Sequence, residues 1–159
     1  MKHPSIILLI GLSLCLFLSC NNRVAYHSFL PIDTEGWDKK DPLEFDVPRL
    51  QQSGQYQLEL TVRTTNTYPY TSLVLQQEIQ THQRSKRQHI ERQTVVVPMV
   101  DKEGKRLSKG IGQYEYTVLT KQVSLAQGDS LAVFYHHHMQ REVLPGISEI
   151  GIRLKQLQP

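Results

Sequence analysis

Three consecutive histidines, at positions 136 to 138, are the residues whose type and spacing most directly suggest chemistry. If the segment is a strand, His136 and His138 share one face, while His137 points to the other. Two imidazoles can share a metal ion, but a stable site usually has three or four protein ligands. Glu142 and Glu149 are the only carboxylates that follow. We therefore expect an exposed or half-buried strand end and no metal.

Other residue patterns do not predict catalysis. No G-x-S-x-G turn is present, and the chain has no paired carboxylates of the kind that glycoside hydrolysis needs. The glycine-rich segment 109–112 lacks the strand-to-helix setting of a phosphate loop. An acidic cluster stands beside Lys39 and Lys40, which is typical of a solvated loop: Asp33, Glu35, Asp38 and Asp41. We expect no enzymatic activity, no catalytic residue and no cofactor.

Cys20 is the residue with the clearest expected chemistry. The chain begins with a short basic segment, and residues 6–18 then form an uncharged apolar run. As a helix this run would rise about 20 Å, which is short of the roughly 30 Å hydrocarbon core of a membrane. A basic start followed by such a run is typical of a signal peptide. Ser19 directly before Cys20 resembles a bacterial lipobox, so we expect residues 1–19 to be cleaved and Cys20 to carry the lipid.

The cysteine count favours the same interpretation. Removing 19 of the 159 residues leaves a chain in which Cys20 is the only cysteine, so no intramolecular disulfide can form. A residue carrying two or more acyl chains holds a protein firmly on a membrane. We expect residues 20–26 to be a lipidated tether and residues 27–159 to be one domain, which is long enough for a core of its own.

The charge pattern gives no sign of a nucleic-acid partner. The formal net charge is only +3, although residues 82–92 form a basic run, HQRSKRQHIER. Such a run is more often a solvated loop or hairpin tip than a binding site, and we expect no nucleic-acid partner for an exported protein.

Apolar and polar residues alternate along much of the chain, as in amphipathic strands. Further segments rich in β-branched and aromatic residues are separated by turn residues, and no amphipathic helix is evident. The pattern predicts an all-β fold, an antiparallel, jelly-roll-like β-sandwich of roughly eight strands. Gln77 interrupts one apolar row. The side chains expected in the core are Leu58, Leu60, Val62, Val133, Ile150 and Ile152.

Three aromatic residues are candidates for a partner surface. Trp37, the only tryptophan, stands in a polar segment before a strand, and Tyr68 and Tyr70 flank Pro69 between two strands. Proline fixes its own φ and pushes the preceding residue towards extended geometry, which would hold the rings in a defined arrangement. One interpretation is a recognition surface. The other is that the rings close the open end of the core.

Several motifs occur in one order along the chain: Cys20, the Trp37 segment, RTTNTYPYTSL, LSKGIGQYE and VLPGISEIGIRL. In this order they resemble the GldH family of gliding-motility lipoproteins, from the signal peptide to the C-terminal strand. The resemblance implies a link to surface gliding and to the type IX secretion apparatus. It brings no catalytic residues and no named partner.

The function expected from the sequence is that of a non-enzymatic outer-membrane lipoprotein, held by its N-terminal lipid and working with envelope proteins of a gliding or secretion complex. The alternative is a glycan- or peptidoglycan-binding module that stacks sugars on Trp37, Tyr68 and Tyr70. Asn21, rather than aspartate, follows the cysteine, and no acid precedes Asp33. An aspartate after the cysteine resembles an inner-membrane retention signal in some bacteria, and the family resemblance implies a bacterial group whose surface-exported lipoproteins tend to carry a short acidic tract there. Because this chain has neither feature, we expect a domain on the outer membrane that faces the periplasm.

Overall fold

The computed structural model describes residues 23–83, 88–108 and 110–158. Within these ranges the regular elements are all strands. No helix in this part of the chain is long and apolar enough to cross a membrane.

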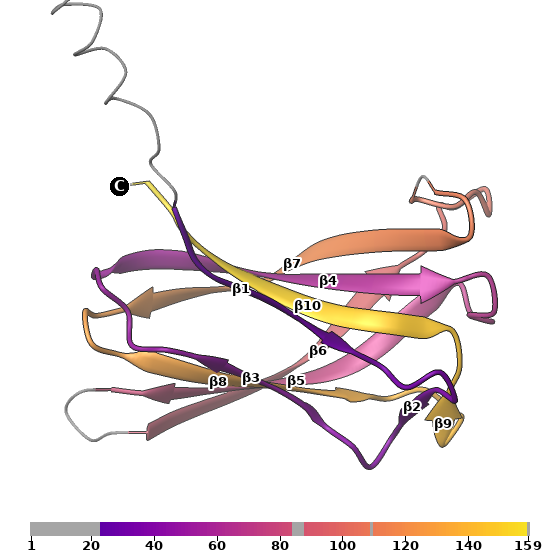
Figure 1. Cartoon of the computed structure of the whole chain (residues 1–159). Helices are drawn as coiled ribbons and strands as arrows, with labels where there is room; N and C mark the ends of the chain where they lie inside the picture. Colours follow the sequence, from indigo (N-terminus) through magenta and orange to yellow (C-terminus); the bar gives the residue numbers. More distant parts are fainter. Residues whose placement is uncertain (1–22, 84–87, 109, 159) are drawn as a thin grey trace, which may run out of the picture.

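Eight main strands form two antiparallel four-stranded sheets that pack face to face (Figure 1). The first sheet consists, in order, of β1 (Val24–Pro31), β10 (Ile147–Gln156), β4 (Gly54–Thr65) and β7 (Gln113–Leu125). The second consists of β3 (Leu43–Val47), β8 (Ser130–His137), β5 (Ser72–His82) and β6 (Gln88–Pro98). A short ribbon pairs β2 (Trp37–Asp38) with β9 (Val143–Leu144). The expected all-β antiparallel sandwich is confirmed.

The strand pairing is that of a jelly roll. Among the eight main strands the first pairs with the last, the second with the seventh, the third with the sixth and the fourth with the fifth. This is the arrangement that results when one long antiparallel hairpin is rolled into two sheets. Every main pair except β5–β6 therefore joins segments that are distant in the sequence.

The register defines two ends of the sandwich. Val24 of β1 pairs with Lys155 of β10, so the described chain begins and ends at one end, which we call the terminal end. Thr65 pairs with Gln113 at the opposite end, the distal end. The distal end is formed by the β1–β3 segment (32–42), the β4–β5 loop (66–71), the β6–β7 loop (99–108 and 110–112) and the β8–β10 segment (138–146).

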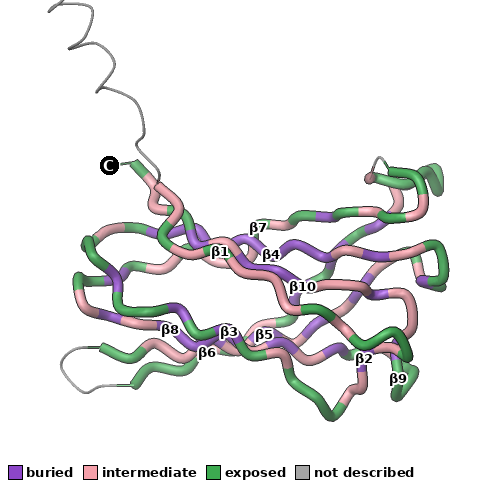
Figure 2. Tube along the Cα trace, in the orientation of Figure 1, coloured by how far each residue is buried: buried purple, intermediate pink, exposed green. Residues whose placement is uncertain are grey.

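The core lies between the sheets and is built from the inward residues of each strand. All six residues expected there are no more than 1% exposed. In Figure 2 buried residues recur along the strands, whereas exposed residues gather in the loops at both ends. The alternation in the sequence therefore marks the core side of these strands correctly.

Gln77 belongs to the core row that it seemed to interrupt. It is fully buried, and its amide nitrogen donates to the hydroxyl of Tyr135 and to Thr120 Oγ1 at 3.1 Å. Its amide oxygen accepts a hydrogen bond from Gln93 at 2.6 Å. Because Thr120 is on β7 and the other three residues are on the second sheet, this polar cluster joins the two sheets inside the sandwich.

Two strands extend further than the sequence suggested. β1 begins at Val24, so the last three residues of the expected tether are in the first sheet. β6 begins at Gln88, so the described end of the basic run lies in a strand rather than in a loop. Residues 84–87, the centre of that run, are outside the described ranges.

Leu60→Ala should lower the free energy of unfolding by about 2–5 kcal/mol, because it removes a fully buried side chain and leaves a cavity. Leu119→Ala is the matched control, since Leu119 is 68% exposed and should change stability by no more than about 0.5 kcal/mol. Urea unfolding of the purified proteins measures both values. Similar losses for the two variants would contradict the placement of Leu60 in the core.

Candidate functional site

The expected lipid site is not part of the described structure. The signal peptide, Cys20 and the start of the expected tether all precede Arg23, the first described residue. Lipidation of Cys20 therefore remains a prediction. The structure does show that the chain enters the domain at the terminal end, because β1 starts there.

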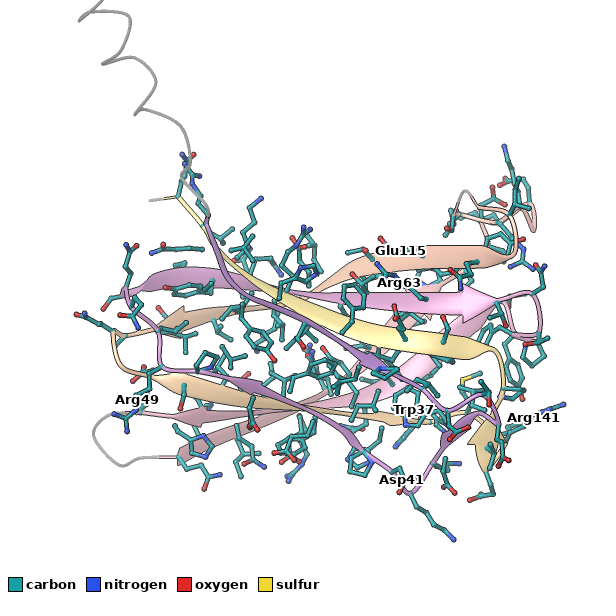
Figure 3. The ribbon with its side chains drawn as sticks, viewed as in Figure 1. Trp37, Asp41, Arg49, Arg63, Glu115 and Arg141 are labelled. Carbon is teal, nitrogen blue, oxygen red and sulfur yellow. The ribbon has the colours of Figure 1, made fainter. Side chains whose placement is uncertain are left out.

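Trp37 lies in the core at the distal end and does not form an exposed surface. It is 2% exposed, because β2 pairs with β9 and brings Trp37 opposite Leu144. The indole Nε1 donates a hydrogen bond to the carbonyl oxygen of Asp41 at 2.8 Å. Its ring meets His137 edge-to-face at 5.3 Å between centroids. The expectation of a recognition surface at Trp37 is therefore wrong, and Figure 3 shows Trp37 and Asp41 at this end.

Tyr68 is also buried, whereas Tyr70 is partly exposed. Tyr68 is 7% exposed, and its hydroxyl donates to the carbonyl oxygen of Ser72 at 2.9 Å. Burial raises the pKa of Tyr68 above its usual value. The two tyrosine rings meet edge-to-face at 5.8 Å. Trp37 and Tyr68 thus close the end of the core, as the second interpretation has it, and Tyr70 is the ring that solvent can reach.

The distal loops are locked together around Gly146. The Gly146 φ angle is +81°, which favours glycine, and a Cβ atom there would lie 2.2 Å from the backbone nitrogen of Tyr68. Its carbonyl oxygen accepts a hydrogen bond from Thr65 N at 2.8 Å. Asn66 Oδ1 accepts another from the hydroxyl of Tyr114 at 2.9 Å. The β4–β5 loop is therefore held by the β8–β10 segment on one side and by β7 on the other.

His137 is buried, unlike its two neighbours. Its Nε2 lies 3.0 Å from the carbonyl oxygen of Trp37. Burial lowers the pKa of His137, and the positive charge of Lys39 acts in the same direction. The imidazole is therefore neutral at neutral pH, and its Nε2–H donates to Trp37. His137 thus links β8 to the β2–β9 ribbon, and this role was not evident from the sequence.

His136 and His138 stay closer to the surface, beside a hollow of about 260 Å³. Its wall includes Glu78, which is already bonded to Arg92 at 2.6 Å. Hydrogen bonds from Gln80 and Arg92 lower the pKa of the Glu78 carboxyl. Among the described residues no three His, Cys, Asp or Glu side chains are placed to hold a metal ion.

A second hollow, of about 270 Å³, lies at the distal end between the β4–β5 and β6–β7 loops. Tyr68 and Tyr70 form part of its wall, together with Arg106 and Tyr116. We call it the distal pocket. Neither Arg106 nor Tyr116 was among the candidate residues predicted from the sequence. The alternation of tyrosines at the start of β7 was the only local sign that Tyr116 faces inward.

The fold and its distal end together define a jelly-roll domain in which four segments interlock around aromatic side chains. The chain belongs to the GldH lipoprotein family, which matches residues 24–154. The resemblance noted from the sequence motifs is thereby confirmed.

Individual relatives are distant. The chain is similar to the gliding motility lipoprotein GldH of Flavobacterium johnsoniae, with 22% identity over 162 residues that cover 98% of this chain and 97% of the relative. Among solved structures, the globular domain of zebrafish complement 1qA has a TM-score of 0.45 at 10% identity, covering 86% of this chain and 98% of its own. The xylan-binding CBM22-1 domain of Paenibacillus barcinonensis Xyn10C has a TM-score of 0.41 at 8% identity, covering 89% of this chain and 86% of its own. Scores this low establish no shared ligand.

Gly146→Ala should lower the free energy of unfolding by about 2–4 kcal/mol, from backbone strain combined with the clash against Tyr68. Gly104→Ala is the matched control, because its φ angle is also +81° but no atom lies within 4 Å of the added Cβ. Thermal or urea unfolding gives both values. Equal losses of stability in the two variants would show that the clash between the added Cβ atom and Tyr68 costs nothing.

Acid should destabilise the protein through His137. The pKa of His137 is lowered in the folded protein. Its contribution to the free energy of unfolding is therefore complete above the ordinary pKa of about 6.5 and is lost as the pH falls below that value, at up to about 1.4 kcal/mol per pH unit. Urea unfolding at about pH 7.5 and about pH 5 should show a smaller loss for His137→Gln than for the wild type. His138→Gln, at an exposed position, should keep the wild-type dependence. Identical pH dependence in all three proteins would refute this assignment.

Proposed function

We propose that this chain is a non-enzymatic lipoprotein of the outer membrane, anchored through acylated Cys20, whose periplasmic domain supports an envelope complex of gliding motility and type IX secretion. Membership of the GldH lipoprotein family is the observation that carries the proposal. The name of the Flavobacterium johnsoniae relative supports the link to gliding.

The geometry supports a partner contact at the distal end. Only two residues, Asn21 and Asn22, separate Cys20 from Arg23, and these three residue-to-residue steps span at most about 10 Å, so an acylated Cys20 would keep the terminal end close to the membrane. The 12-residue strand β4 runs from the terminal to the distal end, and at about 3.3 Å per residue it spans roughly 40 Å. The distal end would therefore point away from the bilayer, towards other envelope proteins.

Three of the motifs that produced the family resemblance also meet at the distal end. The Trp37 segment, the β4–β5 loop and the turn at Gly146 are far apart in the sequence, but they form one interlocked group. A shared surface made by these segments is the candidate partner site, with Tyr70 as its accessible ring.

The glycan-binding alternative has less support. Sugar stacking needs exposed aromatic faces, and the rings of Trp37 and Tyr68 are buried. Tyr70 alone would offer a partial platform.

Cys20→Ser should abolish incorporation of labelled fatty acid and leave the uncleaved precursor in the cell, because the acceptor sulfur is lost. Cys15→Ser is the matched control and should be acylated and processed normally, since bulky Leu14 precedes Cys15. In wild-type cells, external protease should digest the domain only after the outer membrane has been permeabilised.

Acylation of the Cys20→Ser protein would overturn the assignment of the anchor. Digestion in intact cells would place the domain on the cell surface and overturn the periplasmic orientation.

A further inference from the structure

The wall of the distal pocket includes a tyrosine, Tyr116, whose buried hydroxyl forms no hydrogen bond to any described residue. Tyr116 is 5% exposed, and its hydroxyl has no hydrogen-bond partner among the described residues. Buried polar groups are nearly always bonded, so an unpaired hydroxyl in the wall of a hollow needs an explanation. The hydroxyl of Tyr68, which lines the same pocket, is by contrast hydrogen-bonded to the carbonyl oxygen of Ser72. Of these two tyrosine hydroxyls, only that of Tyr116 is left without an acceptor in the described structure.

Arg106 supplies a positive charge at the same pocket. Its guanidinium carbon lies 4.1 Å from the ring centroid of Tyr114, and Asn66 fixes that ring through the tyrosine hydroxyl. Stacking of this kind orients the planar group and leaves its N–H donors free. In the described part of the chain Arg106 forms no ion pair. The nearby carboxylate of Asp101 accepts from backbone nitrogens of its own loop, including Lys105 N at 2.7 Å.

Two exposed apolar side chains belong to the same loop as Arg106. Leu107 is 53% exposed, and Ile111 is fully exposed at 104%. Both are in the β6–β7 loop, which also contributes Arg106 to the pocket. A loop that combines exposed aliphatic side chains with an arginine has residue types that occur together in protein–protein interfaces.

We propose that the distal pocket binds the carboxylate side chain of an aspartate or glutamate carried by an apolar loop of a partner protein. The stacked guanidinium of Arg106 pairs with the carboxylate, and the unused hydroxyl of Tyr116 donates to it. Leu107 and Ile111 pack against the apolar residues beside that acid. This inference rests on the proposed role of the domain in an envelope complex, and it names the chemistry of the contact.

The size of the pocket fits one side chain better than a free small molecule. Its volume of about 270 Å³ is below the roughly 300–1,000 Å³ that is usual for small-molecule sites. A carboxylate also matches the donors, because a guanidinium and a phenol both donate hydrogen bonds and arginine binds carboxylates through paired N–H groups.

The binding test uses the full lipidated protein in phosphatidylcholine nanodiscs and two capped peptides, acetyl-Leu-Glu-Leu-amide and acetyl-Leu-Gln-Leu-amide. Saturation-transfer NMR detects contact with each peptide, and empty nanodiscs give the background. The glutamate peptide should give at least about a fivefold larger signal than the glutamine peptide, because only a carboxylate forms a charge-assisted pair. Equal signals above background, or no signal from either peptide, would overturn the proposal.

Three variants locate the contact. Arg106→Gln should reduce the glutamate-peptide signal at least about fivefold, whereas Arg141→Gln, an exposed arginine also at the distal end, should leave it unchanged (Figure 3). Tyr116→Phe should reduce the signal but not the stability, since its hydroxyl bonds to no described residue. An unchanged signal in Arg106→Gln, or a loss of stability in Tyr116→Phe that accounts for its lost signal, would refute the assignment.

A crosslinking experiment in intact cells separates this proposal from the proposed function. A photoreactive benzoylphenylalanine at Ile111 should form a discrete adduct with a protein, and Arg106→Gln should weaken that adduct at least about fivefold. An adduct that is insensitive to Arg106→Gln would refute the carboxylate pocket but keep the envelope contact. An adduct with lipid only, or no adduct, would overturn both the carboxylate pocket and the proposed contact with an envelope protein.

Discussion

Strand β4 is the element on which the rest of the domain depends, because it is buried on both faces. Its inward residues supply the middle of the core. Its outward residues are polar, and the neighbouring strands bond them: Glu59 accepts from Arg153 of β10 at 2.6 Å, and Thr61 meets Thr117 of β7 at 3.0 Å. A shift of one residue would place Glu59 inside and Leu60 outside. The strict alternation of β4 therefore fixes the register of the whole first sheet.

Local alternation made the fold predictable from the sequence. Each of the eight main strands coincides with a segment that was rich in alternating or β-branched residues, and the six expected core residues are buried. Gln77 was harder, because a glutamine in an apolar row is tolerated only when partners from other strands bond it. Those partners, Thr120 and Gln93, lie 43 and 16 residues away in the sequence. No local sequence pattern predicts such a cluster of hydrogen-bonded side chains.

The candidate site was less predictable, for the same reason. The sequence around Trp37 is polar, but the residue becomes buried because β9, about a hundred residues later, pairs with β2. Tyr70 was identified from its own neighbours, whereas Arg106 and Tyr116 join it only through the jelly-roll pairing. Residue type could identify the aromatic rings in advance, but which ring faces solvent depends on long-range contacts.

The pairing of the first strand with the last has a mechanical consequence. β1 lies at the edge of its sheet and is hydrogen-bonded to β10 from Val24 to Pro31. A pulling force between a lipid anchor and a partner at the distal end would run along these strands, whereas their hydrogen bonds lie perpendicular to the strands. The bonds would then be loaded together in shear and would not open one after another. A jelly roll held in this direction is a linkage that can transmit tension between a membrane and a protein.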